Sequence, residues 1–289
     1  MESKTNTLTN YLSLVKFSHT IFALPFAIIG YFLAITYTEA SFEPKLFALV
    51  VLCMVFARSA AMAFNRYIDR TIDEQNTRTA IREIPAGIVK PKSALIFVIA
   101  NCVLFITATY FINPLCFYLS PVALAVVLGY SLTKRFTALC HLVLGLGLSL
   151  APIGAYLAVT GKFDWLPLFF SFAVLFWVSG FDIIYALQDE EFDRSKNLKS
   201  IPVFLGKKGA LLFSTILHLI SAGFIIYAGV YAKFDLWYWI GAAFYCLLLF
   251  YQHTLVKPND LSKVNLAFFT TNGIASVVFA AFVLIDLYV

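Results

Sequence analysis

Charged residues are scarce in this sequence. Asp, Glu, Lys and Arg make up 13% of its 289 residues, whereas a soluble domain carries about 25%. Six stretches contain no charged residue at all, and they span residues 17–38, 93–133, 136–161, 209–232, 236–256 and 264–285. A helix needs about 20 apolar residues to cross a bilayer. Each stretch is long enough for one crossing, and 93–133 for two. The composition excludes an ordinary soluble protein and predicts an all-α, polytopic membrane protein.

Cysteine and histidine motifs are also missing. The five cysteines show no CxxC spacing, four of them lie inside apolar runs, and the four histidines form no ligand spacing with them. Small apolar helix residues are the simplest interpretation of these cysteines, and a zinc or haem site is unsupported. The N-terminus has no basic segment or cleavage site before the first apolar run, so we expect that run to remain as a membrane span. No Pro/Ser-rich linker interrupts the chain, and residues 1–289 are expected to form a single membrane-embedded domain.

Nine spans fit the apolar pattern. They are expected at roughly 17–38, 46–64, 93–112, 115–133, 138–159, 165–188, 209–232, 236–256 and 265–286. Ahead of them, apolar residues at 8, 11, 12 and 15 predict a short interfacial helix. The pair separated by Asn113-Pro114 is alternatively one long helix that the proline kinks.

Positive charge gives the orientation of these spans. Nine crossings put the N-terminus and the segments 65–92, 134–137, 189–208 and 257–264 on one side, together with 18 of the 21 Lys and Arg residues. This asymmetry predicts that the basic side faces the cytoplasm, in a bacterial inner or plasma membrane. No basic stretch is interleaved with aromatic residues, so no nucleic-acid partner is expected.

Polar residues recur every four positions at the end of the second expected span. These are Asn65, Asp69 and Asp73. On a continuous helix they share one face, with their oxygens converging. Such a face suits a hard divalent cation, which prefers oxygen ligands and takes waters or phosphate oxygens as the rest. Arg66, inside this stretch, has no evident role in the pattern.

A second acidic stretch closes the sixth expected span. Asp182, Tyr185, Asp189 and Asp193 share a face if the helix is continuous, and Asp182 lies inside the apolar run. A carboxylate at that depth is costly and by default faces a cavity or a partner. Four carboxylates facing one another would repel unless cations lay between them. Mg²⁺ is the cation that all-oxygen ligands and a phosphate group favour.

Basic residues accompany both acidic stretches on the predicted cytoplasmic side. Their guanidinium and ammonium groups are candidates for phosphate oxygens, and they are Arg70, Arg78, Arg82, Arg135 and Lys199. The alternative is that they hold the loops on an anionic leaflet, but that does not explain the acids among them. A diphosphate site below apolar, aromatic-rich spans suits a lipid diphosphate, and aromatic faces can also stabilise a carbocation.

These residues resemble the signatures of the UbiA-type family of intramembrane aromatic prenyltransferases. The first signature, Asn-x-x-x-Asp-x-x-x-Asp, matches residues 65–73, and the second, Asp-x-x-Tyr-Ala-x-x-Asp-x-x-x-Asp, matches residues 182–193. The loop with Arg78, Thr79, Arg82, Pro85 and Gly87 and the pair Lys134-Arg135 extend the resemblance over nearly the whole chain. Within the family, the pattern is most similar to 4-hydroxybenzoate polyprenyltransferases, in a branch that also resembles the menaquinone enzyme of the futalosine route. Arg66 departs from the Asp that many hydroxybenzoate enzymes have there.

The resemblance implies Mg²⁺-dependent transfer of a polyprenyl group from polyprenyl diphosphate to the ring of 4-hydroxybenzoate or a similar aromatic acid, in ubiquinone or menaquinone biosynthesis. Prenylation of 1,4-dihydroxy-6-naphthoate is the alternative. The resemblance assigns the metal to Asp69, Asp73, Asp189 and Asp193. Expected catalytic residues are Asp182, Tyr185 and Arg70, and expected substrate-binding residues are Asn65, Arg78, Arg82, Lys134, Arg135 and Lys199. Arg135, with Lys134, is the candidate partner of the acceptor's carboxylate.

A transporter of an anionic metabolite is the rival from another class. Transporter sites tend to lie near the bilayer centre on broken helices. Here the acids gather at helix ends on one face, which favours chemistry on a lipid substrate.

Overall fold

The computed structural model describes residues 7–16, 20, 22–38 and 40–289. Within these ranges every regular element is a helix. The long helices are α2 (Leu24–Thr38), α3 (Pro44–Ile68), α5 (Pro91–Tyr110), α6 (Pro114–Thr133), α7 (Cys140–Thr160), α8 (Trp165–Ala186), α10 (Ile201–Ala232), α11 (Leu236–Leu255) and α12 (Asn272–Tyr288). The short ones are α1 (Thr7–Leu14), α4 (Arg70–Glu74), the 3₁₀ turn η2 (Leu187–Asp189), α9 (Glu190–Ser195) and the π-helical turn η3 (Leu266–Thr271).

Each expected span coincides with one long helix, and the expected helix before them with α1. Of the first span, residues 17–19 and 21 lie outside the described part of the chain. Seven segments are long and apolar enough to cross a membrane, which confirms an integral membrane protein. At 15 residues α2 is shorter, and α11 is not among the seven. The count of nine crossings therefore stays a prediction.

Local sequence explains where the helices begin. Proline occupies the first helical position of α3, α5 and α6, where its missing N–H costs nothing. Ahead of α6, the Asn113 side chain accepts a hydrogen bond from Cys116 N at 2.8 Å. Asn113-Pro114 thus separates two helices, which excludes the single kinked helix. α10 begins at residue 201, earlier than expected, and is broken at Gly206, whose φ of 68° a side chain would disfavour.

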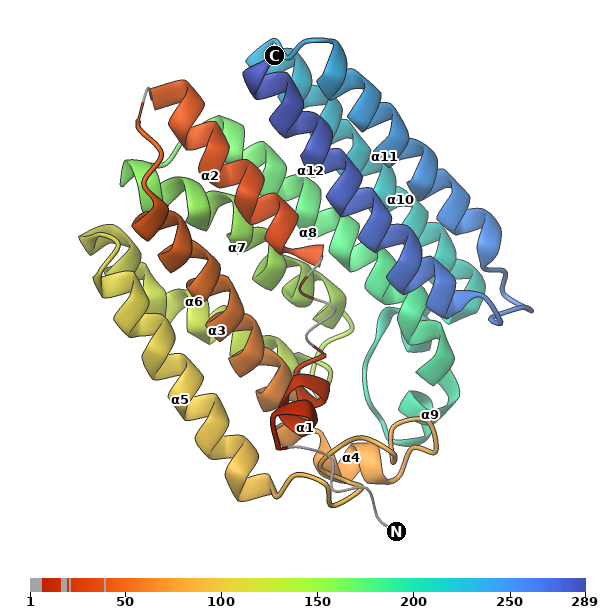
Figure 1. The fold of residues 1–289 in the computed structure, drawn as a ribbon. Helices are drawn as coiled ribbons and strands as arrows, with labels where there is room; N and C mark the ends of the chain where they lie inside the picture. Colours follow the sequence, from red (N-terminus) through yellow and green to blue (C-terminus); the bar gives the residue numbers. More distant parts are fainter. Residues whose placement is uncertain (1–6, 17–19, 21, 39) are drawn as a thin grey trace.

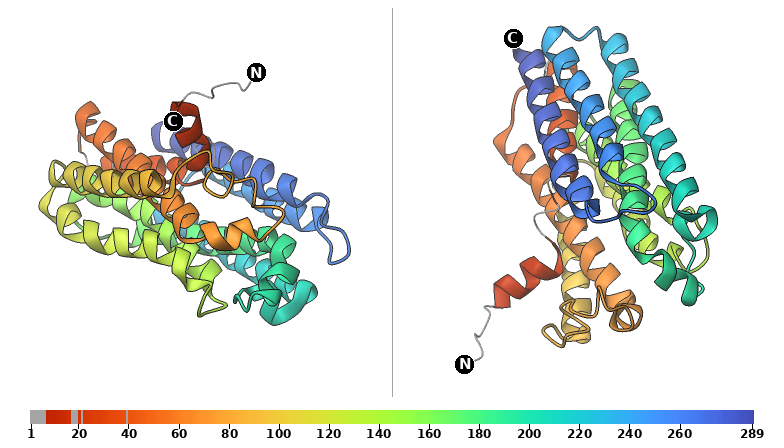
Figure 2. Two further views of the ribbon diagram at one scale, coloured as in Figure 1. Left: turned by 90° about the horizontal axis from the view of Figure 1, so that it is seen from below. Right: turned by 90° about the vertical axis from the view of Figure 1, so that its right-hand side faces the viewer.

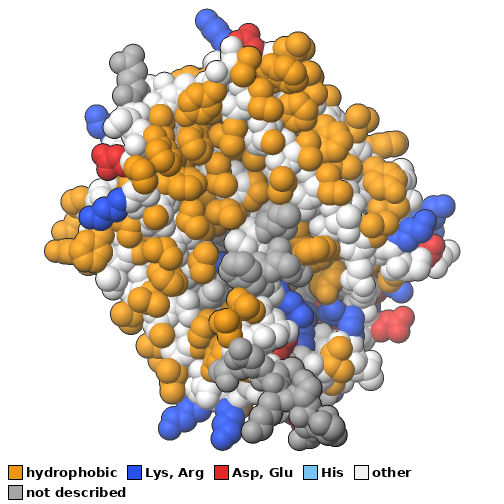
Figure 3. Space-filling model, in the orientation of Figure 1, with side chains coloured by type: hydrophobic (Ala, Val, Ile, Leu, Met, Phe, Trp, Pro, Cys, Tyr) orange, Lys and Arg blue, Asp and Glu red, His pale blue; other side chains and the backbone are white. Residues whose placement is uncertain are grey.

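The long helices lie side by side, and their polar connections gather at one end (Figures 1 and 2). That end, called the charged end below, consists of α4, α9 and the segments 75–90, 134–139 and 196–200. The visible face above it is mostly hydrophobic (Figure 3). A hydrogen bond from Lys199 N to Lys134 O at 2.8 Å ties two of these segments together.

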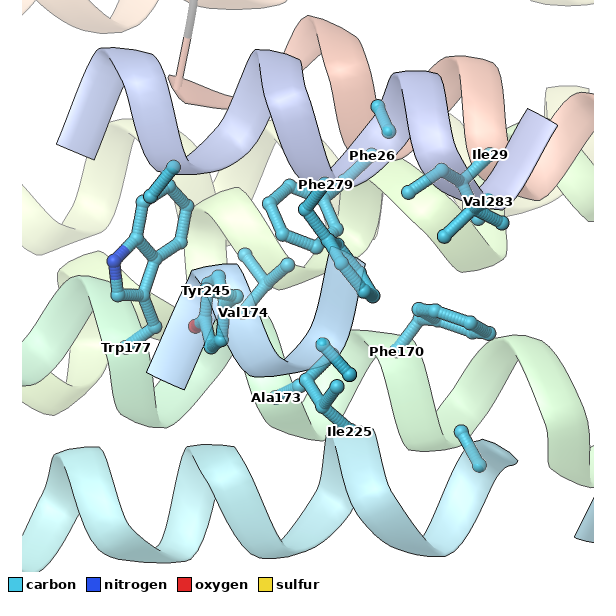
Figure 4. Close-up of a cluster of buried hydrophobic side chains, with 14 of the residues drawn as sticks. Phe26, Ile29, Phe170, Ala173, Val174, Trp177, Ile225, Tyr245, Phe279 and Val283 are labelled. Carbon is cyan, nitrogen blue, oxygen red and sulfur yellow. The ribbon is translucent and has the colours of Figure 1, made fainter. Parts of the chain in front are cut away.

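The packed centre of the bundle surrounds α8, which makes its most extensive contacts with α10 and α7. Phe170 and Trp177 of α8 are fully buried against rings of neighbouring helices, including Phe26, Tyr245 and Phe279 (Figure 4). Trp177 Nε1 donates to Asn272 Oδ1 at 2.9 Å, so the buried indole N–H is satisfied. This rigid centre fixes α8, and with it the residues at its end.

Replacing Gly30 by Val should destabilise the bundle. A Cβ at Gly30 would lie 2.0 Å from the backbone oxygen of Pro152, so α2 and α7 must move apart. We expect a loss of about 3 kcal/mol, the upper range for overpacking. The measurement is the fraction of monodisperse protein that remains in detergent after heating. Gly223→Val is the control, since a Cβ there meets nothing within 4 Å. Equal melting of both variants would contradict the close approach.

Candidate active site

A cavity of about 630 Å³ opens at the charged end of the bundle. Its walls come from the ends of α3, α6 and α8, the start of α7, the segment after α4, and η3. Its charged lining residues are Lys16, Arg58, Arg66, Asp69, Asp73, Arg78, Arg82, Lys134, Arg135, Asp182, Asp189 and Asp193. Both acidic stretches therefore meet in one cavity. With seven basic and five acidic side chains, this cavity suits an anionic ligand.

The first acidic stretch is not one continuous helix, although a continuous helix was the condition for the shared face in the sequence analysis. α3 ends at Ile68, Asp69 has φ −90° and ψ 3°, and α4 begins at the next residue. Backbone hydrogen bonds from Asp69 N to Asn65 O (3.0 Å) and from Asp73 N to Asp69 O (2.7 Å) nevertheless keep the four-residue rise. Asn65 Nδ2 donates to Asp69 Oδ2 at 3.1 Å, and all three side chains line the cavity.

The second acidic stretch is interrupted in a similar way. α8 ends at Ala186, the 3₁₀ turn η2 follows, and α9 carries the last carboxylate. Asp182, Tyr185, Asp189 and Asp193 all line the cavity despite the change of helix type. The four side chains are therefore on one side, although the stretch is not a single continuous helix.

Each of the four expected metal-binding carboxylates has a basic partner from another segment. The pairs are Arg135–Asp69 (2.7 Å), Arg82–Asp73 (2.7 Å), Arg78–Asp189 and Lys134–Asp193 (2.7 Å). Burial raises the pKa of the Asp69 carboxyl above its ordinary value, and the charge of Arg135 only partly offsets this. A positive charge thus lies beside each of the four carboxylates, which reduces their mutual repulsion.

Arg78 joins the segment after α4 to the second acidic stretch. Its Nε donates to Asp189 Oδ1 at 3.0 Å, Nη2 pairs with Oδ2, and Nη1 donates to the Tyr185 hydroxyl at 3.0 Å. Asn76 Nδ2 adds a hydrogen bond to Asp189 Oδ1 at 3.0 Å. Burial would lower the pKa of Arg78, but the hydrogen bonds and charge interactions with Asp189 and Tyr185 together outweigh that effect and raise it. Arg78 therefore stays charged and fixes Asp189.

The donor set fits a hard cation, although no group of three or more possible metal ligands is assembled within the described ranges. Asp73 Oδ2 and Asp193 Oδ2 are buried oxygens without a hydrogen-bond partner, and both residues line the cavity. Unsatisfied buried carboxylate oxygens are costly. A cation such as Mg²⁺, which needs only one or two protein carboxylates besides water and phosphate, would satisfy them.

Two expected site residues lie outside the cavity lining. Arg70 Nη1 donates to Tyr67 O at 2.6 Å, and its guanidinium lies over the Tyr67 ring. The Lys199 side chain is exposed and donates to Phe136 O at 3.1 Å. Spacing alone did not reveal these two contacts with backbone oxygens, one with a neighbouring residue and one with a distant segment. The other expected residues all line the cavity: Asn65, Arg78, Arg82, Lys134, Arg135, Asp182 and Tyr185, with the four metal candidates.

His141 is a cavity residue that the sequence pattern did not single out. Its Nδ1 lies 2.7 Å from Asp182 Oδ2, and its Nε2 accepts a 3.4 Å hydrogen bond from Ile201 N. This arrangement gives the deep carboxylate Asp182 a partner inside the bundle. The only sequence signal was a histidine at the start of an apolar run, 41 positions from Asp182.

Aromatic rings form the wall beside Tyr185. The π-helical turn η3 carries Phe268 and Phe269 to the cavity, and the Phe268 and Tyr185 ring centroids are 4.2 Å apart. The ring centroids of Phe181 and Phe268 are 5.4 Å apart. π-Helical turns are frequent at functional sites, because they re-aim side chains. This wall can face a positively charged carbon.

A second, apolar cavity of about 340 Å³ adjoins the first. The two share Arg58, Met62, Tyr130, Leu144 and Leu148 in their linings. α3, α6 and α7 supply most of the remaining wall. A ligand with an anionic head and a long apolar tail matches the two cavities together.

Comparison with known proteins agrees with this geometry. The model of the UbiA prenyltransferase family matches residues 23–274. The chain belongs to this family. A 4-hydroxybenzoate octaprenyltransferase of Nitrosomonas europaea is 30% identical over 250 residues, which cover 85% of this chain and 84% of that protein. The prediction of a prenyltransferase is confirmed, and the transporter alternative is set aside.

Solved UbiA structures share the fold. The apo structure of a UbiA homologue from Aeropyrum pernix K1 superposes with a TM-score of 0.83 at 30% identity, covering 93% of this chain and 98% of that one. A UbiA homologue from Archaeoglobus fulgidus, bound to DMAPP and Mg²⁺, gives a TM-score of 0.77 at 22% identity over 97% and 99% of the two chains. The paired cavities described above are thus those of a UbiA-fold protein.

Proposed function

We propose that residues 1–289 act as one Mg²⁺-dependent enzyme that transfers a polyprenyl group from its diphosphate to the ring of 4-hydroxybenzoate or a similar aromatic acid. The observation that carries the proposal is the junction of the two cavities. A positively charged pocket with unsatisfied carboxylate oxygens adjoins an apolar one, and five residues line both. The site serves quinone synthesis and faces the cytoplasm, on the side with most of the Lys and Arg.

The diphosphate head binds at the charged end. Asp69, Asp73, Asp189 and Asp193 hold Mg²⁺, with Asn65 beside them, and Mg²⁺ offsets the charge that develops on the departing diphosphate. When the carboxylates turn toward the metal, their basic partners become available for phosphate oxygens. Those partners are Arg78, Arg82, Lys134 and Arg135. The ion pairs thus keep both sets of charges preorganised before the donor arrives.

The transfer itself exchanges one bond for another. The bond between C1 of the prenyl group and the diphosphate oxygen breaks, and the electron pair leaves with the diphosphate. A ring carbon ortho to the phenol forms the new bond to C1 and then loses its proton. Asp182, held by His141, is the group that takes the proton, and Tyr185 with Phe268 faces the allylic cation. Arg70 and Lys199 have no direct role, because neither lines the cavity.

The proposal is tested with purified protein in detergent or nanodiscs. Radiolabelled polyprenyl diphosphate is supplied with Mg²⁺ and either 4-hydroxybenzoate or 1,4-dihydroxy-6-naphthoate. We expect a labelled prenyl-hydroxybenzoate and no product after chelation of the metal. Product with the naphthoate alone would move the acceptor assignment to the menaquinone branch. Absence of product with both acceptors would contradict the proposed function.

A further inference from the structure

The π-helical turn η3 is held by side-chain hydrogen bonds from two helices. Gln252 Nε2 of α11 donates to Ala267 O at 2.8 Å, and Asn272 Nδ2, at the start of α12, donates to the same oxygen at 3.0 Å. Asn272 Nδ2 also donates to Phe268 O at 2.8 Å. π-Helical turns are rare in proteins. These donors to two consecutive carbonyl oxygens therefore stabilise a conformation that the backbone alone seldom adopts.

Both amide side chains are fully buried in the bundle. Asn272 Oδ1 accepts from Trp177 Nε1 at 2.9 Å, which ties η3 to α8 as well. Gln252 Oε1 is different, because it is buried and has no hydrogen-bond partner within the described residues. Such an oxygen lowers stability, and an apolar side chain of the same size would avoid that cost. The hydrogen bond from Gln252 to Ala267 O therefore explains why a polar residue occupies this position.

η3 delivers the ring of Phe268 to the aromatic wall of the polar cavity. The centroids of Phe268 and Tyr185 are 4.2 Å apart, and those of Phe181 and Phe22 lie 5.4 and 5.5 Å from Phe268. Each residue of an α-helix adds a rotation of about 100°. Conversion of η3 to an α-helical turn would therefore rotate Phe268 by about that angle relative to the packed part of α12. The ring would then leave Tyr185, or α12 would have to repack.

We infer that Gln252 and Asn272 are positioning residues, which keep η3 in its π-helical form so that Phe268 covers the allylic cation and excludes water from it. Neither residue lines either cavity, so both act through the ring of Phe268. The inference rests on the proposed function and deepens it, because it adds the buried amides that place the aromatic wall.

The allylic cation has two competing partners. Attack by the acceptor's ring carbon forms a C–C bond at C1 and releases the ring proton. Attack by water forms a C–O bond at C1, releases a proton and gives a polyprenol. An aromatic face over the cation stabilises it, and the bulk of the ring keeps water out. The ratio of polyprenol to prenylated acid therefore reports where Phe268 lies.

The test measures that ratio in Gln252→Met and Asn272→Leu, which keep the side-chain size but remove the donors to η3. Purified protein in nanodiscs receives radiolabelled polyprenyl diphosphate, Mg²⁺ and the aromatic acid that the wild-type protein prenylates, and the two labelled products are separated. Loss of one cation–π contact predicts a fall of about 10-fold in kcat for prenylation and a rise of at least about 3-fold in the polyprenol share. The KM for polyprenyl diphosphate should change less than about 3-fold, because the charged end is unaltered.

A double-mutant cycle with Phe268→Leu separates positioning from a general loss of stability. Phe268→Leu removes the ring itself and should also raise the polyprenol share. Because Gln252 acts through that ring, Gln252→Met should change the share by less than about 2-fold once Phe268→Leu is present. Independent, additive effects of the two substitutions would overturn the inference, and so would a wild-type product ratio in Gln252→Met.

Tyr245→Phe is the matched control, because it also removes one buried hydrogen bond of α11. The Tyr245 hydroxyl contacts Ser221 Oγ at 2.9 Å rather than η3. Its product ratio should stay within about 2-fold of wild type, even where the melting temperature falls. A raised polyprenol share in Tyr245→Phe would mean that any loosening of the bundle admits water, which overturns the inference. Failure of the wild-type protein to prenylate any aromatic acid would instead count against the proposed function.

Discussion

Replacing Asp189 by Asn is expected to lower kcat by at least about 10³-fold, the scale of losing one electrostatic contact to a transition-state charge. The substitution keeps the shape of the side chain but removes the charge that Arg78 and a metal require. Arg78 then loses its ion pair, and the hold of the segment after α4 on the second acidic stretch weakens. Single-turnover measurements with radiolabelled prenyl diphosphate at saturating Mg²⁺ give the rate directly. Asp69→Asn should behave alike, since Asp69 occupies the equivalent place in the first stretch and pairs with Arg135.

Glu191→Gln is the matched control for the loss of one carboxylate. Glu191 lies two positions from Asp189, but its side chain is 92% exposed. Its one ion pair, with Lys207, is long, with 3.9 Å between Nζ and Oε1. Its rate should stay within about 2-fold of wild type, as for an exposed ion pair of little energetic weight. Elution of Asp189→Asn as a monodisperse species would show that the bundle is intact. A near-normal rate for Asp189→Asn or Asp69→Asn would contradict the proposal that both acidic stretches bind the metal.

The membrane bundle was predictable because it depends on the amino-acid composition of long segments. Runs without charge have a single physical solution in lipid, a helix whose backbone groups bond to one another. Proline and asparagine at helix starts set the boundaries, and Asn113-Pro114 ended one helix as its capping chemistry requires. The exact start of α10 was not predictable, because the helix resumes beyond a glycine with positive φ.

The acidic residues of the site were predictable from their spacing, but their partners were not. A four-residue interval survives at Asp69 even though the helix breaks there, because the backbone hydrogen bonds continue. The pairing of Arg82 with Asp73, or of Lys134 with Asp193, depends on how distant segments pack. His141 was missed for that reason, since its contact with Asp182 joins α7 to α8. Arg70, expected among the catalytic residues, does not line the cavity, because its side chain turns back from α4 onto Tyr67 of α3.

Most charged side chains of the site thus have an ion-pair partner within the site, and a smaller number of buried polar atoms have no partner. Ion pairs hold the acidic and basic side chains in place before any ligand arrives. Among the charged lining residues in the described part of the chain, the buried atoms without a hydrogen-bond or ion-pair partner are two carboxylate oxygens, on Asp73 and Asp193, and two guanidinium Nε atoms, on Arg58 and Arg66. The proposed metal–diphosphate complex would satisfy the carboxylate oxygens. The apolar cavity, whose one charged lining residue in the described part of the chain is Arg58 at its boundary with the polar cavity, is left for the tail of the donor.

Replacing Gly154 by Phe is expected to shorten the prenyl chain that the enzyme accepts. Gly154 lines the apolar cavity, and a Cβ added there meets nothing within 4 Å, so the new ring enters the cavity rather than the helix packing. A ring that displaces about four methylene-sized groups of the tail removes about 3 kcal/mol of apolar burial. This corresponds to a loss of about 10²-fold in kcat/KM for long-chain donors. A short donor such as geranyl diphosphate should be used within about 3-fold of the wild-type rate, since its tail ends before the ring.

Gly223→Phe provides the matched control for Gly154→Phe. Gly223 is also a helical glycine with open space around it, but it lies on an exposed face of α10 and lines neither cavity. A donor series of increasing length, assayed with both variants and the wild-type protein, gives the ratio of long-chain to short-chain kcat/KM. That ratio should fall only for Gly154→Phe, because only this ring competes with the tail for the apolar cavity. An unchanged ratio in both variants would mean that the tail leaves the polar cavity by another route, between helices other than α3, α6 and α7.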